Sequence, residues 1–297
     1  MTWMFVPVRH RFSLAVLPAL LAGCASLTTP PAPVRTEVVL AVTASMELLT
    51  FNAGQPAHIL QRTPITGLPA GDALVGIDYR VARGVLYALS QAGRLYTLDA
   101  RSGALQPVGA GASLALPQGA FGMDFNPTVD RIRVVGPGGL NLRLHPDTGA
   151  QVDGDAAQSG VQPDGALHYA ADDAHAGQRP DIVAAAYTYN TRNEQLTTNY
   201  AIDRRQGTLV MQGSLEGAVP VVSPNTGALR TVGALGLGPL ADAVFDISDV
   251  SNTALAALRT GGQAPTRLYQ IDLASGRATA LGTVGDGAAL LGIAIAP

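Results

Sequence analysis

Three aspartates recur at the same place in short apolar segments, and carboxylates gathered at one point can carry chemistry. Asp78, Asp124 and Asp246 each lie near the end of such a segment. If the segments surround one axis, the three carboxylates could hold a hard cation such as Ca²⁺, which prefers oxygen ligands. They could also repel one another and raise a pKa enough for acid–base catalysis. The simpler interpretation, which we favour, is that each aspartate caps a turn or accepts backbone N–H bonds within its own sheet.

A polar turn, NPTVDR at residues 126–131, is the second candidate site. Asn-Pro favours a turn, and a salt bridge from Asp130 to Arg131 or Arg133 that supports this turn is the interpretation we favour. A functional interpretation is also open. Arg131 and Arg133 stand two residues apart on a predicted strand, so they point to one side and could bind a carboxylate or phosphate. The predicted ligand-binding residues are therefore Asn126, Asp130, Arg131 and Arg133.

A long connection over residues 154–180 holds further acids and two histidines. These are Asp155, Asp164, His168, Asp172, Asp173 and His175. Their spacing matches no established metal motif, and we favour a solvated loop. The sequence also has no G-x-S-x-G elbow, no H-E-x-x-H and no Walker A motif. We therefore lean towards a protein that is not an enzyme.

Short strands must position these residues. After residue 35 no window shows a helical apolar period, and short apolar runs are separated by clusters of Gly, Pro, Asn and Asp. This pattern is typical of an all-β protein. Residues 74–109 and 121–153 align over four strand-like pieces at a spacing of 46 residues. A strand that ends in Asp and a turn closed by Gly recurs at 94–103, 199–207 and 267–276.

Four-stranded units at this period predict a five-bladed β-propeller. The units cover residues 74–109, 121–153, 181–233 and 242–285. Residues 38–65 supply three strands and residues 290–297 the missing first one, so the C-terminal strand would close the ring. In this alignment Tyr187 and Ala294 occupy the positions of the three aspartates beside the channel. An open β-sandwich and a β-solenoid are the alternatives.

The N-terminal residues predict a signal for export to the cell envelope. Arg9 and Arg11 precede a short apolar run that ends in Leu21-Ala22-Gly23-Cys24. This run resembles the lipobox of bacterial lipoproteins, in which the cysteine is lipidated, palmitate being one of the acyl chains. An ordinary secretory peptide is the alternative. We expect a signal peptide at 1–23, a lipidated Cys24 with a Pro-rich tether at 24–36, and a propeller domain at 37–297. Residue 25 is Ala and not Asp, which indicates the outer membrane.

Several stretches resemble a family of bacterial secreted proteins, the domain-of-unknown-function family 4394. They are LVGIDYR, LYALSQAGRLYTLD, FGMDFNPTVDRIRVV, NLRLHPDTG, DIVAAAYTYN and GALRTVGALG. The resemblance runs over roughly residues 38–296, with FGMDFNPTVDRIRVV as its most specific part. The resemblance implies that the protein is an exported propeller, and it does not imply any particular activity.

The amino-acid composition excludes several classes of function. The net charge of −3 shows no basic excess, so we expect no nucleic-acid partner. One Cys excludes a disulfide scaffold, and the absence of Lys excludes lysine Schiff-base chemistry. We expect a monomeric, non-enzymatic outer-membrane lipoprotein, on the periplasmic or surface side, that binds an envelope protein or a small ligand, with Ca²⁺ as the one cofactor considered. The alternative is a periplasmic metal-assisted hydrolase or lyase that uses the channel-side aspartates.

Overall fold

The computed structural model describes residues 1–4, 33–111 and 113–297 of the chain. Most of the predicted signal peptide (residues 5–23), Cys24 and most of the tether lie outside these residues. Within them, strands form five sheets, and the only helices are the short 3-10 turns η1 (Val81–Arg83), η2 (Pro137–Gly139) and η3 (Pro224–Thr226). None of these is long or apolar enough to cross a membrane. The prediction of an all-β fold is confirmed.

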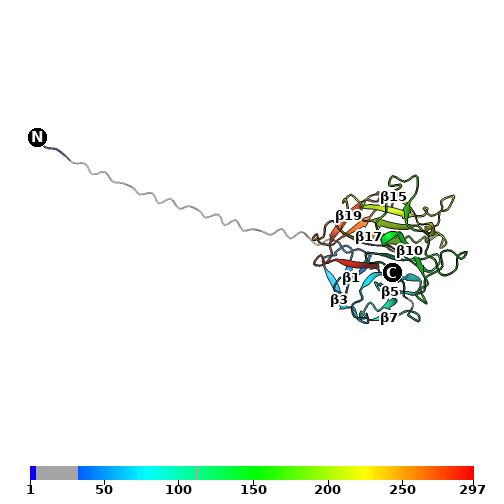
Figure 1. Ribbon diagram of the computed structural model, residues 1–297. Helices are drawn as coiled ribbons and strands as arrows, with labels where there is room; N and C mark the ends of the chain where they lie inside the picture. The colour runs from blue at the N-terminus through cyan, green and yellow to red at the C-terminus, as the bar shows by residue number, and fades with distance from the viewer. Residues whose placement is uncertain (5–32, 112) are drawn as a thin grey trace. The chain divides into compact units, whose positions relative to one another are not determined.

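The five sheets are the blades of a propeller (Figure 1). Blade 1 has the order β20 (Leu290–Ile295), β1 (Val38–Thr43), β2 (Glu47–Asn52) and β3 (Ile59–Pro64). Blade 2 has the order β4 (Leu74–Arg80), β5 (Val85–Ser90), β6 (Leu95–Leu98) and β7 (Leu105–Pro107). Blade 5 has the order β16 (Asp242–Ile247), β17 (Ala254–Arg259), β18 (Arg267–Ile271) and β19 (Ala278–Thr283).

Blades 3 and 4 depart from the predicted four strands. Blade 3 has β8 (Gly122–Asn126), β9 (Arg131–Gly136) and β10 (Leu140–Leu144), and beyond β10 only a single bridge joins Leu144 to Gln151. Blade 4 has β12 (Ile182–Tyr187), β13 (Asn199–Asp203), β14 (Thr208–Gln212) and β15 (Ala228–Ala234). The short β11 (His168–Tyr169) adds to β15 in parallel. The four-piece alignment was therefore wrong for the second unit, because the chain after β10 leaves blade 3 and reaches the edge of blade 4.

The two ends of the described domain meet in blade 1. β20 pairs antiparallel with β1, and Val39 lies opposite Ile295 and Ala41 opposite Ile293. The C-terminal strand thus completes the sheet that begins after the tether, and the predicted ring closure is confirmed. Closure leaves no blade at the end of an open array, where an unpaired sheet would invite edge-to-edge association.

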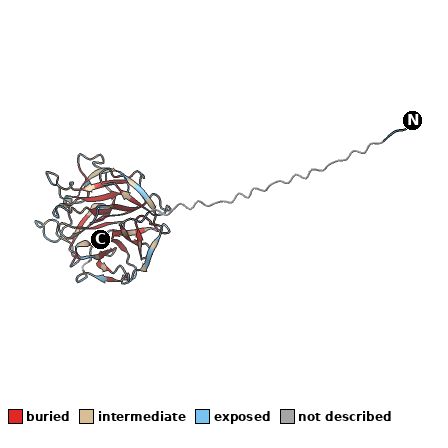
Figure 2. Ribbon diagram, turned by 180° about the vertical axis from the view of Figure 1, so that it is seen from behind, coloured by how far each residue is buried: buried red, intermediate tan, exposed pale blue. Residues whose placement is uncertain are grey.

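The core lies between blades. Each of five apolar clusters joins two neighbouring blades, and long stretches of the strands are buried (Figure 2). In β1, for example, Val39 and Ala41 pack with blade 5, whereas Leu40 and Val42 pack with blade 2. Successive side chains of a strand point to opposite faces, so one apolar run can serve two interfaces. This explains the runs of consecutive apolar residues in the sequence.

Three glycines bring the innermost strands close together at one end of the channel. A Cβ on Gly122 of β8 would lie 2.3 Å from the backbone nitrogen of Ala185 in β12. A Cβ on Gly292 of β20 would lie 2.9 Å from the nitrogen of Ile77, and one on Gly76 would lie 2.8 Å from the Cβ of Met123. The cavity left at this end measures about 10 Å³, roughly the limit for a single water. The channel is therefore closed here.

Replacing Gly122 by Ala tests this close approach. The new methyl group meets backbone atoms of β12, which cannot turn away as a side chain can, so we expect a loss of about 1–3 kcal/mol in the free energy of unfolding. That loss corresponds to a fall of several degrees in Tm by calorimetry. Gly261→Ala is the matched control, because nothing lies within 4 Å of that position. Equal Tm values for the two variants would contradict the packing argument.

Candidate functional site

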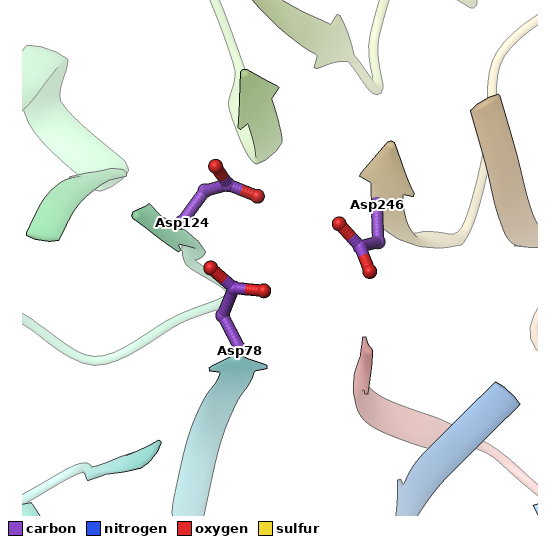
Figure 3. A group of neighbouring side chains, drawn as sticks. All are labelled: Asp78, Asp124 and Asp246. Atoms are coloured by element: carbon purple, nitrogen blue, oxygen red, sulfur yellow. The ribbon is translucent and has the colours of Figure 1, made fainter. Parts of the chain in front are cut away.

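Three buried carboxylates meet inside the ring. Asp78 of β4, Asp124 of β8 and Asp246 of β16 come from three different innermost strands and point into a common space (Figure 3). Each offers an oxygen, and these oxygens all lie within 4.8 Å of one another. The residues are only 6%, 4% and 4% exposed. Among the residues that the structure describes, this is the one group of three metal-ligating side chains so placed.

Two of these carboxylates connect one blade to the next. Asp78 accepts from the backbone N–H of Tyr79 in its own strand at 2.7 Å, and its other oxygen accepts from Phe125 of blade 3 at 2.7 Å. Asp124 accepts from the N–H of Tyr187 in blade 4 at 3.0 Å. The favoured interpretation placed such bonds within one blade. The structure corrects it, because the carboxylates also bridge neighbouring innermost strands.

Asp246 repeats the arrangement and fixes the register of the ring. It accepts from Ile247 at 2.6 Å and from Ile295 of blade 1 at 2.5 Å. In every case the bridged N–H belongs to the residue that follows the aspartate position in the next blade. Tyr187 provides such an N–H, so Ala186 and not Tyr187 aligns with the aspartates, and the predicted alignment was wrong by one residue. The Tyr187 side chain instead accepts a hydrogen bond from Arg133 at 3.0 Å.

Burial without a nearby cation changes the acid strength of these groups. Desolvation, and secondarily the other acids, raises the pKa values of Asp78 and Asp124 well above the usual range. Desolvation raises the pKa of Asp246 to about 8, and that of the nearby Asp249 to about 7. Three ionised carboxylates cannot stay together in a low-dielectric space, so the group must retain protons or take up a cation.

The donor set suits a hard divalent cation. Carboxylate oxygens at this spacing can surround an ion with metal–oxygen distances near those of Ca²⁺, about 2.3–2.6 Å. Asp78, Asp124 and Asp246 would hold the ion, and the backbone N–H bonds would orient their oxygens. The same group without an ion can share protons, which is the other chemistry open to it.

A pocket opens directly beyond the aspartates. This mouth pocket has a volume of about 520 Å³ and is lined by residues that follow the aspartates along the chain, among them Arg80, Phe125, Asn126, Asp130, Glu194, Asp249 and Val250. Asp249 has no hydrogen bond or ion pair to any described residue and interacts electrostatically with the three buried acids. The mouth pocket therefore has an acidic side chain without a partner among the described residues.

The turn at 126–131 is held from the neighbouring blade. Arg80 of blade 2 donates from Nε to Asp130 at 2.8 Å and from Nη1 to Asp147 at 2.6 Å, and its Nη2 pairs with the second oxygen of Asp130. The predicted pairing of Asp130 with Arg131 or Arg133 is thus wrong, because Arg80 takes both oxygens of Asp130. Asn126 lines the mouth pocket. It accepts two hydrogen bonds from Thr128, at 2.9 and 2.7 Å, and these bonds stabilise the turn.

Arg131 and Arg133 have different surroundings. Arg133 is 2% exposed and makes four hydrogen bonds, to Tyr187, to Asn141 and Asp164 at 2.7 Å each, and to Asn225 at 2.6 Å. It ties blade 3 to blade 4. Arg131 is half-buried, donates only to backbone oxygens of the turn, and has no carboxylate partner in the described part of the chain. Only Arg131 of this pair is free to receive a ligand.

Both arginines line a second pocket of about 520 Å³, which we call the arginine pocket. Asn126 lines this pocket as well as the mouth pocket, so the two adjoin. Of the four predicted ligand residues, Asn126, Arg131 and Arg133 line the arginine pocket and Asp130 lines the mouth pocket.

Sequence reasoning missed two charged residues of these pockets, Arg143 and Asp249. Arg143 lines the arginine pocket and shares Asp164 with Arg133, whereas Asp249 lines the mouth pocket. Arg143 stands opposite Arg133 in the β9–β10 ladder, and this register was the signal that could have found it. Asp164 lies in the long connection, which is anchored here and is not a merely solvated loop. The histidines of that connection do not meet, since His168 bonds Ala166 and His175 bonds Thr231.

Comparison with known proteins yields a family match. A family model described as a domain of unknown function, DUF4394, matches residues 47–294. No curated protein matches the chain.

Solved structures share the architecture at low identity. A chain of the nidogen/laminin complex is 12% identical with a TM-score of 0.48, covering 88% of this chain and 98% of its own. Glutaminyl cyclase from Myxococcus xanthus is 13% identical with a TM-score of 0.42, and the coverage is 81% and 97%. A putative 6-phosphogluconolactonase from Bacteroides uniformis is 13% identical with a TM-score of 0.41, at 86% and 84%. These likenesses concern the fold alone.

The raised pKa of Asp246 predicts a pH-dependent stability. Between about pH 4 and 8 the folded state binds more protons than the unfolded chain, so the free energy of unfolding falls as pH rises through this window. In chelator we expect Tm to fall by at least about 2–4 °C between pH 5 and 8, on the order of 1 kcal/mol. Excess Ca²⁺ should reverse the fall, because the ion binds the ionised carboxylates.

Asp246→Asn should remove much of this pH slope and of the Ca²⁺ effect, whereas Asp286→Asn, at a carboxylate 69% exposed, should leave both unchanged. A Tm that is flat with pH and indifferent to Ca²⁺ and Mg²⁺ would rule out both the proton-sharing and the cation interpretation. Differential scanning calorimetry in matched buffers gives both readings.

Proposed function

The chain belongs to the DUF4394 family, which supplies a fold and no activity, and we propose from its own residues that it is a non-enzymatic binding protein of the bacterial cell envelope. In this proposal a lipid on Cys24 anchors it to the outer membrane, on the periplasmic or surface side, and the propeller presents one face to an envelope protein or a small ligand. The protein acts as a monomer.

The observation that carries the proposal is the concentration of pockets on one face. The connections after the first and third strands of each blade lie on the same side, since those strands run in the same direction; we call this side the exit face. Both pockets of about 520 Å³ open among these connections, and each lies within the range of small-ligand sites. Exposed apolar side chains line them, namely Val129, Leu215, Val221 and Val250. Grouped exposed apolar residues beside pockets are typical of binding surfaces.

The proposed location in the cell envelope is supported by the sequence alone. Leu21-Ala22-Gly23-Cys24 follows a short apolar run, and the Pro-rich residues after it would hold the domain off a lipid surface. Acyl chains contribute roughly 0.8 kcal/mol for each CH₂ they bury, so two or more give stable anchoring.

A metal-assisted hydrolase or lyase is the second candidate. It is favoured by Asp249, whose pKa burial raises to about 7 and which lines the mouth pocket beside the three buried acids. A carboxyl group of that pKa can exchange protons near neutrality. This candidate needs a cation at Asp78, Asp124 and Asp246, so the effect of Ca²⁺ on Tm described above tests it.

Blocking the mouth pocket tests the binding role. We expect Val250→Arg to abolish in vivo cross-linking to an envelope component, because Val250 is 64% exposed and lines this pocket. Leu60→Arg is the matched control, since Leu60 is 56% exposed on the outermost strand of blade 1. A cross-linking pattern that both variants share with the wild-type protein would count against docking at the mouth pocket.

Substituting the cysteine tests the anchor. In the producing bacterium, Cys24→Ser should lose labelling by radioactive palmitate and move the protein from the outer-membrane fraction to the soluble fraction. Ser26→Ala should retain both properties. Membrane retention of Cys24→Ser would show that another segment provides the anchor.

A further inference from the structure

The arginine pocket has more hydrogen-bond donors than its surroundings use. Asn126 Oδ1 accepts from Thr128, and Asn225 Oδ1 accepts from Arg133, so both amide orientations are fixed. Their Nδ2 groups have no bonding partner among the described residues and belong to side chains that line the pocket. These two structural bonds thus leave two amide donors without a partner among the described residues.

Two arginines add charge to these donors. Arg131 lacks a carboxylate partner in residues 33–111 and 113–297. Arg143 binds Asp164 through Nε and Nη2, and its Nη1 has no partner in the same residues. Because Arg133 and Arg143 share the single carboxylate of Asp164, this group retains a positive charge. Free donors together with excess positive charge favour a carboxylate.

A carboxylate with one oxygen that lacks a donor among the described residues, that of Glu216, lines the same pocket. Glu216 accepts from Asn190 at 3.1 Å through Oε1, whereas its Oε2 is buried without a partner. A buried carboxylate oxygen that lacks a donor is unfavourable, so it fits a ligand that brings an N–H group. Between these polar groups the lining is apolar, through Leu196, Leu215 and Val221.

We propose that the arginine pocket binds a small N-acylated amino acid with an apolar side chain. Its α-carboxylate bonds to Arg131, Arg143 and the two asparagine amides, its N–H donates to Glu216 Oε2, and its side chain packs on the leucines and Val221. The inference rests on the proposed binding function and names the ligand class of one of its two pockets. A chain end of a longer peptide shares this chemistry, and the pocket volume favours the small molecule.

Calorimetric titration of the purified full chain with N-acetyl-L-leucine tests the assignment. We expect a Kd of about 0.1–1 mM, which suits a ligand of this size. N-acetyl-leucine amide lacks the carboxylate and 4-methylpentanoate lacks the N–H, so each should bind about tenfold more weakly or not at all. A pentapeptide ending in leucine that binds much more tightly than N-acetyl-leucine would assign the pocket to peptide ends and overturn the small-molecule assignment.

Arg131→Gln should weaken N-acetyl-leucine about tenfold without lowering Tm, because no carboxylate loses its partner. Arg277→Gln, in the outer hairpin of blade 5, should change neither. Equal binding of the acid and its amide, equal affinity of Arg131→Gln and the wild type, or no binding at millimolar ligand would each overturn the proposal. These outcomes leave the cross-linking of Val250→Arg unaffected, so failure here is distinguishable from failure of the binding role.

Discussion

Hydrogen bonds between a carboxylate of one innermost strand and a backbone N–H of the next hold the centre of this propeller together. An innermost strand has a sheet partner on one side only, so the backbone groups on its other side need partners in a buried place. Asp78, Asp124 and Asp246 supply acceptors for three of the five neighbouring strand pairs. The ring is thereby joined at its axis as well as through the apolar clusters between blades.

This solution has an electrostatic consequence. Three carboxylates that satisfy backbone donors must converge, because the strands that carry them converge. Their burial favours the neutral form, and none of the three forms an ion pair with an arginine of the described residues. The hydrogen bonds that join the strands at the axis thus create a group that must share protons or take up a cation, and the segments that follow these strands line the mouth pocket. Structure and chemistry are therefore not separate uses of these aspartates.

The blades and their closure could be predicted because their signals are local. Strand alternation, Asp and Gly at the turns, and complementary end fragments are all visible in the sequence. The register of β12 could not be predicted, since its run of alanines carries neither the Gly nor the Asp that marks the other innermost strands. Partners across blades were also out of reach. Arg80 bonds to Asp130, which is 50 residues away in the sequence, and Arg133 bonds to Asn225, which is 92 residues away. These pairs are brought together by the closed ring, and no local sequence pattern indicates them.

The same cross-blade bonds explain why the exit face offers donors. Arg133 is buried and satisfied, and it takes the carbonyl oxygen of Asn225. The side-chain amide of asparagine has one acceptor oxygen and one donor NH₂ group. Because Oδ1 of Asn225 accepts from Arg133, its Nδ2 donor is left without a partner among the described residues. Sharing Asp164 between two arginines acts in the same direction, because one carboxylate cannot neutralise two guanidinium groups. The polarity of the arginine pocket thus follows from how blades 3 and 4 are joined, and a change in the contacts between these blades would change that polarity.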